Sequence, residues 1–261
     1  MNKTRTPNFS SPFSPLPRIG TTAALDFFAS WREINSLLQF LLHLAGKADL
    51  TSEIAHKALI EGEDDPVKKI ALDKRWKEQK KAVDVLREQR QLLLEVILVR
   101  HIENYLNYLS SLLYEIFTKR PETLRSSEKI EVSDLLKHNT MDDIVRDIAV
   151  RKVSSLSYSS LSNLAEFFSD RFGLSIASSE QLSVACEAAE IRNISVHNRC
   201  IINERYMSRT GCDSALLGQK KELFIGYLDE IVAILADLVK ALDFSATRKM
   251  KLKNIRFKLK K

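Results

Sequence analysis

Helix breakers are almost missing from this chain after its first seventeen residues. The 261 residues include seven Gly and six Pro, and four of the prolines lie before residue 18. Pro removes a backbone donor and Gly adds backbone freedom, so both interrupt helices. Many windows carry apolar residues at i, i+3, i+4 and i+7, and few show the alternation of a half-buried strand. The sequence therefore predicts an all-α fold, long enough to bury a sizeable core.

The composition divides the chain into three parts. Residues 1–20, rich in Pro and Ser, are expected to form a flexible arm. A single all-helical domain is predicted for 21–245, with an N-terminal helical extension over 21–90 and a core over 91–245. Residues 246–261 form a basic tail: eight Lys or Arg lie after residue 247, and without them the net charge of +6 becomes −2. Such a tail either neutralises nucleic-acid phosphates or stays solvated and disordered.

Capping residues predict where the N-terminal helices begin and end. We expect a first helix from Thr21 or Thr22 to Gly46, and a shorter one over 52–60. Acidic residues followed by Pro66 predict the start of another helix, since acidic side chains favour the positive end of the helix dipole and Pro fits the first turn. An unbroken helix from there to Lys119 would span roughly 80 Å at ~1.5 Å per residue, so we expect a break or a projecting part within 74–90.

The second half of that span predicts the buried centre of the fold. Residues 92–117 are apolar over more than half of the helix circumference. Arg120 and Pro121 end this central helix, and short helices are expected over 132–137, 141–156 and 160–172. A further helix should open at Ser178 or Ser179, and a last long helix is predicted over 216–244.

Several function classes are disfavoured by composition. Three cysteines without CxxC spacing favour a reducing, cytoplasmic setting. No window of about eighteen apolar residues predicts a membrane span, and the N-terminus lacks the apolar segment of a secretory signal. The five His are scattered, without HExxH or CxxC pairing, so we expect no metal and no other cofactor. His43, His56 and His101 are interpreted as structural.

Arg192, Asn193 and His197 form the one chemically suggestive group, within 187–206. On a helix, Asn193 and His197 are one turn apart and share a face. Arg192 lies ~140° round from His197 at 3.6 residues per turn, so these two side chains do not aim at one atom in a straight helix. They could converge if the helix frays near Val196, or if two copies of the helix face each other across a two-fold axis.

Phosphodiester transfer is the chemistry that needs such a group. Attack of an RNA 2′-hydroxyl on the adjacent phosphorus requires a base, an acid for the departing 5′-oxygen, and positive charge beside the phosphorus. His transfers protons near neutral pH. Arg offers a fixed, charged fork that matches phosphate oxygens, and Asn can orient a hydroxyl or an imidazole. The alternative interpretation is that the spacing arises by chance, with an exposed Arg beside a His that caps carbonyl groups at the end of the helix.

The spacing of this group resembles the signature of the HEPN superfamily of all-helical proteins. That signature is an Arg, usually followed by a polar residue, with a His four to six residues further on; here it is Arg192-x4-His197 with Asn193. The similarity covers roughly 92–244, including the approach helix over 182–190 and the turn that leads to Tyr206. One departure is Cys200, which stands where a glycine with a left-handed backbone is expected.

The resemblance implies a HEPN-type helical bundle with a long central helix and extra N-terminal helices. It also implies a homodimer through the signature helix and a metal-independent endoribonuclease that leaves 2′,3′-cyclic phosphates. His197 would be the acid/base group, Arg192 the phosphate clamp and Asn193 the orienting residue. Such proteins act as toxins or abortive-infection effectors in bacterial antiviral defence, often with an antitoxin or other regulatory partner. The alternative is a non-catalytic RNA-binding or protein-interaction module.

Overall fold

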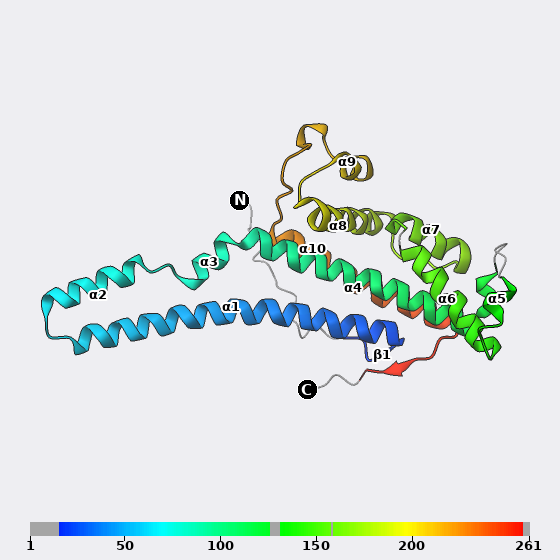
Figure 1. The fold of residues 1–261 in the computed structure, drawn as a ribbon, viewed down its shortest axis with the longest axis horizontal. Coiled ribbons are helices and arrows are strands. Elements are labelled where there is room, and N and C mark those ends of the chain that lie inside the picture. The colour runs from blue at the N-terminus through cyan, green and yellow to red at the C-terminus, as the bar shows by residue number, and fades with distance from the viewer. Residues whose placement is uncertain (1–15, 126–130, 158, 258–261) are drawn as a thin grey trace, which may run out of the picture.

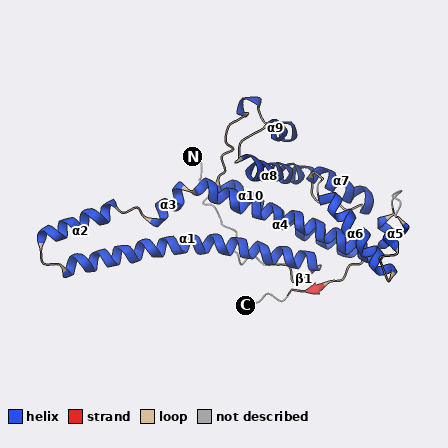
Figure 2. Cartoon of the chain, viewed as in Figure 1, coloured by secondary structure: helices blue, strands red, loops and turns tan. Residues whose placement is uncertain are grey.

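A helix of 30 residues, α4 (Arg90–Lys119), runs through the centre of the protein, as the apolar span 92–117 predicts. The computed structural model describes residues 16–125, 131–157 and 159–257, and the chain is an all-α helical bundle (Figures 1 and 2). Residues 1–15 of the predicted arm (1–20) and the last four residues lie outside the described part. The other elements are β1 (Ile19–Gly20), α1 (Thr22–Gly62), α2 (Pro66–Glu78), α3 (Ala82–Glu88), the 3-10 helix η1 (Pro121–Leu124), α5 (Val132–Leu135), α6 (Met141–Ser157), α7 (Leu161–Phe172), α8 (Ser179–Asn198), α9 (Glu204–Thr210), the 3-10 helix η2 (Ser214–Leu216), α10 (Ile225–Met250) and β2 (Ile255–Arg256).

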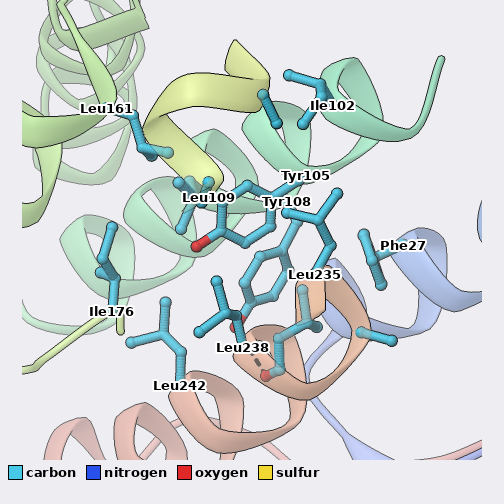
Figure 3. Close-up of a cluster of buried hydrophobic side chains, with 14 of the residues drawn as sticks. Phe27, Ile102, Tyr105, Tyr108, Leu109, Leu161, Ile176, Leu235, Leu238 and Leu242 are labelled. Atoms are coloured by element: carbon cyan, nitrogen blue, oxygen red, sulfur yellow. Dashed lines mark hydrogen bonds between the residues drawn. The ribbon is translucent and has the colours of Figure 1, made fainter. Parts of the chain in front are cut away.

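The core forms around α4, which packs against α1, α6, α8 and α10 (Figure 3). Tyr105 and Tyr108 of α4 are almost fully buried between these helices. Burial raises the pKa of both phenols well above the ordinary value, so both stay neutral. The first half of α1 belongs to this same core, since Phe27 packs edge-on against Tyr108 at a ring-centroid distance of 5.9 Å. The division into a 21–90 extension and a 91–245 core therefore does not follow the packing.

The expected helix end at Gly46 is wrong, because α1 continues without interruption for 41 residues to Gly62. A helix-interior Gly costs only ~1 kcal/mol relative to Ala, which neighbouring contacts readily offset. Here the second half of α1 packs against α2 and α3, which run back beside it as a projecting hairpin (Figure 1). His56 of α1 stacks on Trp76 of α2, with ring centroids 4.5 Å apart, and lies 3.2 Å from Asp73.

The helix start at Pro66 and the break within 74–90 are confirmed. Asp65 caps α2, and its carboxylate accepts a hydrogen bond from the backbone of Val67 at 2.8 Å. The chain leaves helical geometry between Glu78 and Ala82, and again at Gln89. These breaks divide the span Pro66–Lys119 into α2, α3 and α4, so the hairpin folds back on α1.

Three elements meet at the N-terminus of α1. Thr21 is fully buried, and its backbone N–H and hydroxyl both donate to the carboxylate of Asp243 on α10, at 3.1 and 2.5 Å. Glu115 of α4 accepts from the backbone of Ala23 at 2.8 Å. Burial raises the pKa of both carboxyl groups. A side chain at Gly20 would place its Cβ 2.7 Å from Asp243 Oδ2, so the close approach requires glycine here.

The last helix differs from its expected bounds at both ends. Residues 216–224 are not part of α10, because their backbone pairs instead with the turn after α8. Ile202 donates to the carbonyl of Gln219 at 2.9 Å, and Lys221 donates to that of Cys200 at 2.8 Å. At its other end α10 continues to Met250, so the boundary set between residues 245 and 246 falls inside a helix.

The described part of the basic tail is held against the bundle. Ile255 and Arg256 of β2 pair antiparallel with Gly20 and Ile19 of β1. Phe257 donates its backbone N–H to the carbonyl of Arg18 at 2.9 Å, and its ring lies 6.5 Å from that of Phe28. Residues 16–20 and 251–257 thus stabilise each other. In the described residues, no helix combines the length and the apolar character needed to cross a membrane.

His101 should make stability depend on pH. It is 1 % exposed on α4, and burial lowers its pKa from 6.5 to about 4. As the pH falls, the imidazole of His101 is therefore protonated in the unfolded chain before it is protonated in the folded one. Stability present at pH 7 is consequently lost as the pH falls through 6.5 towards 4. We expect His101 to account for a loss of about 2 kcal/mol between pH 7 and pH 5. Urea titrations at both pH values should show this loss in wild type and in the exposed-site control His43→Gln, and not in His101→Leu. An equal loss in His101→Leu would contradict the assignment.

Candidate functional site

The predicted site residues lie on α8, whose ends are set by its own sequence. Ser178 opens the helix with a reciprocal capping box: its hydroxyl accepts from the backbone of Gln181, and Gln181 accepts from the backbone of Ser178, each at 3.3 Å. The helix then runs unbroken to Asn198. Arg199 and Cys200 follow with φ of 52° and 61°, in the left-handed region that stops an α-helix.

Contacts with α4 fix the direction of α8. Near the end of α8, Arg192 forms an ion pair with Glu103 in the middle of α4. The turn after α8 contacts the carbonyl of Lys221, and the same carbonyl accepts a hydrogen bond from Gln91 at the start of α4. The two helices therefore run antiparallel, in agreement with their arrangement in Figure 1. Small and branched apolar side chains make the close contact; those buried on α8 are Ala185, Ala188, Ile191 and Ile194.

Arg192 is held by two neighbours. Its Nη2 lies 3.1 Å from Glu103 Oε1, and its Nη1 donates to Asn193 Oδ1 at 3.1 Å. Its side chain is 25 % exposed and that of Glu103 is 30 % exposed. The Nε donor is buried and has no hydrogen-bond partner among the described residues. The guanidinium thus has one unsatisfied donor, and its charge is partly compensated by a carboxylate.

Asn193 extends the contacts of Arg192 into a network across three helices. Its Nδ2 donates to Glu190 Oε2 at 3.2 Å, and Glu190 Oε1 accepts from Arg209 Nη1 of α9 at 2.5 Å. Glu190 is 7 % exposed, so its charge needs these donors. Asn193 therefore orients Arg192, and the network leaves its amide without a contact to the imidazole of His197.

His197 stands apart from the other two residues. It is exposed in the last turn of α8, and in the described part of the chain no hydrogen bond or ion pair holds it. Since α8 is continuous through Val196, the fraying that could bring Arg192 and His197 together does not occur. Within one chain the two side chains leave the helix ~140° apart.

The turn after His197 is built around Cys200. Its thiol is fully buried, accepts from the Ser195 hydroxyl at 3.4 Å and donates to the Lys221 carbonyl at 3.5 Å. Its φ of 61° is the left-handed geometry for which the resemblance expects glycine. Cys200 adopts that geometry and in addition fills space that glycine would leave empty.

A second polar cluster lies beside the turn. Tyr206 of α9 donates to Glu187 Oε1 at 3.2 Å, and Lys221 Nζ lies 3.0 Å from the same oxygen. Lys221 is also 5.8 Å from the centre of the Tyr206 ring. Burial, reinforced by Glu187, raises the pKa of Tyr206 far above its ordinary value, so the phenol is a hydrogen-bond donor.

Sequence reasoning missed three residues of the site: Glu103, Glu190 and Arg209. Glu190 stands three residues before Asn193, and the i, i+3 spacing on one helix could have indicated this pair. Glu103 and Arg209 come from other helices, so no local pattern indicates them. No cluster of three or more His, Cys, Asp or Glu side chains that could bind a metal ion occurs within the described ranges.

Comparisons with protein-family models, with curated proteins and with solved structures find no match to this chain. The all-α fold and the geometry around Arg192 are therefore the observations on which a function can be argued.

Cys200 should be chemically inert in the folded protein. Its thiol is fully buried and burial raises its pKa, so little thiolate is present and reagents cannot reach it. Iodoacetamide labelling followed by peptide mass spectrometry should modify Cys200 at least about a hundredfold more slowly in the native protein than in urea. Native labelling of Cys200 as fast as in urea would show that the turn opens.

Proposed function

We propose that this protein is a metal-independent endoribonuclease of the HEPN type, in which Arg192, Asn193 and His197 act on RNA. The observation that carries the proposal is the fixed, partly exposed Arg192 fork, oriented by Asn193, on the same helix end as an exposed His197. Arg supplies permanent charge for a phosphate, and His can transfer protons near neutral pH.

The proposed reaction is attack of an RNA 2′-hydroxyl on the adjacent phosphorus. His197 would take the 2′-hydroxyl proton or return a proton to the departing 5′-oxygen, and the products would be a 2′,3′-cyclic phosphate and a 5′-hydroxyl. Arg192 would hold the non-bridging oxygens as charge develops on them. For this Arg192 must exchange Glu103 for phosphate, and its side chain must shift so that the buried Nε becomes accessible; a phosphate oxygen would then supply the hydrogen bond that Nε lacks.

Two copies of the chain would be needed to complete the site. Arg192 and His197 diverge within one helix, whereas a two-fold axis beside α8 would let Arg192 of one copy approach His197 of the other. An apolar surface supports such pairing: Val196 of α8 and Val96 and Leu92 of α4 are 49, 50 and 57 % exposed. The antiparallel register of α8 and α4 places Val196 opposite the turn that carries Val96. The defence role and the regulatory partner that the resemblance implies belong to this same proposal.

Removal of either proposed catalytic side chain should abolish cleavage. We expect Arg192→Ala and His197→Ala each to lower the cleavage rate by at least ~100-fold, the usual contribution of a proton-transfer group or a transition-state donor. The assay is incubation of total RNA with purified protein in EDTA, followed by analysis of product ends for 2′,3′-cyclic phosphate. Arg75→Ala and His43→Ala, which alter exposed side chains on α2 and α1, are the matched controls.

The nuclease proposal fails if the wild type binds RNA but never cleaves it in the presence or absence of EDTA. It also fails if either site variant retains full activity. RNA binding without cleavage would support the alternative of a non-catalytic module.

Val196→Glu should dissociate the proposed dimer. A buried, unpaired carboxylate between two copies is costly, so we expect the dissociation constant to rise by at least about tenfold and cleavage to fall with it. Sedimentation velocity over a concentration series, with cleavage measured on the same samples, checks both effects. Val150→Glu is the matched control, since Val150 of α6 is 54 % exposed and lies off this surface. A wild type that stays monomeric at all concentrations would contradict the shared site.

A further inference from the structure

An apolar groove opens where α1, α3, α4 and the start of α10 meet, and its volume is about 480 Å³. Its floor is formed by Leu38 of α1 and Leu94 of α4, which are buried, and its walls include Leu42, Leu86 and Leu223. Pockets of 300–1,000 Å³ with predominantly apolar walls are typical of small-ligand sites. The groove is separate from Arg192 and is not used by the proposed nuclease site.

Hydrogen bonds fix two of the backbone segments that border the groove. At one end, Asp49 of α1 accepts from the backbone N–H groups of Ala82 and Val83, at 2.6 and 3.0 Å, which fixes α3 against α1. At the other end, Gln91 donates to the carbonyl of Lys221 and accepts from the backbone of Leu223, both at 3.0 Å. The backbone at the start of α3 and at residues 221–223 is therefore held in place beside the groove.

Two arginines line this apolar space. Arg87 is paired with Asp84 at 2.6 Å, whereas Arg90 has no hydrogen bond or ion pair with any residue that the structure describes. Both side chains are exposed, so they lie at the rim of the groove and not under its floor. An apolar compartment beside an unpaired guanidinium suits a ligand with an apolar chain and an anionic head.

We propose that the groove binds a single-chain amphiphile with a carboxylate head, such as a fatty acid, with the chain on Leu42, Leu86 and Leu94 and the carboxylate on Arg90. A partner helix fits less well, because its diameter with side chains is ~10–12 Å, so that about one turn of it would already fill the 480 Å³ of the groove. The proposal stands independently of the nuclease function.

Binding of dodecanoate to the full-length protein, measured by calorimetry below the critical micelle concentration, tests the proposal. We expect one site per chain. Arg90→Gln should weaken binding about tenfold, and neutral dodecanol should bind wild type more weakly by a similar factor. Leu42→Glu and Val83→Glu should each weaken dodecanoate binding more than about tenfold, since they place a carboxylate on the apolar wall. Circular dichroism verifies the fold of each variant.

Two matched controls separate the groove from general surface effects. Leu59→Glu changes an exposed apolar residue near the far end of α1, and Arg75→Gln changes an exposed arginine on α2; neither should alter affinity. The proposal is overturned if wild type shows no saturable binding, or if Leu59→Glu weakens binding as much as Leu42→Glu. A wild-type dimer that Leu42→Glu dissolves, without dodecanoate binding, would assign the groove to a second copy instead.

Discussion

Burial of α4 is the constraint on which the rest of this structure depends. Because its apolar surface extends round most of the helix, α1, α6, α8 and α10 can all pack on it. Acidic residues along the same helix then fix individual neighbours: Glu115 binds the N-terminus of α1, Glu103 binds Arg192 of α8, and Glu95 pairs with Lys220 at 3.0 Å. The apolar face supplies most of the stabilisation, and each carboxylate adds one polar contact to a particular neighbour.

The fold class follows from the sequence because local signals agree with one another. Scarce Gly and Pro, helical apolar spacing, the start at Pro66 and the cap at Ser178 all indicate helices, and the structure has them there. The errors arise where tertiary contacts outweigh local preference. Gly46 does not end α1, since the hairpin packs along it, and residues 216–224 do not join α10 because their backbone pairs with the turn at Cys200.

The candidate site was only partly predictable, for a related reason. Helical spacing places Asn193 and His197 on one face and Arg192 off it, and the unbroken α8 confirms that geometry. Glu103, the partner of Arg192, lies 89 residues before it in the sequence, and Arg209, the partner of Glu190, lies 19 residues after it. Both contacts therefore depend on how α4 and α9 pack against α8. The local sequence pattern shows which side chains share a face of one helix. The charged groups around those side chains come from other helices, so they depend on tertiary packing.

That charge environment limits what one copy of the chain can do. In a single chain Arg192 is neutralised in part by Glu103, and His197 leaves the continuous helix in a different direction. Phosphate binding must compete with an existing, partly buried ion pair, and a phosphate group can do so because it accepts two parallel hydrogen bonds from one guanidinium. A second copy would supply the missing imidazole and also exclude water from the Arg192 fork, which strengthens its attraction for phosphate. If the proposed function holds, assembly would control catalysis: the isolated chain would keep its cation occupied, and pairing would bring together the groups that the reaction requires.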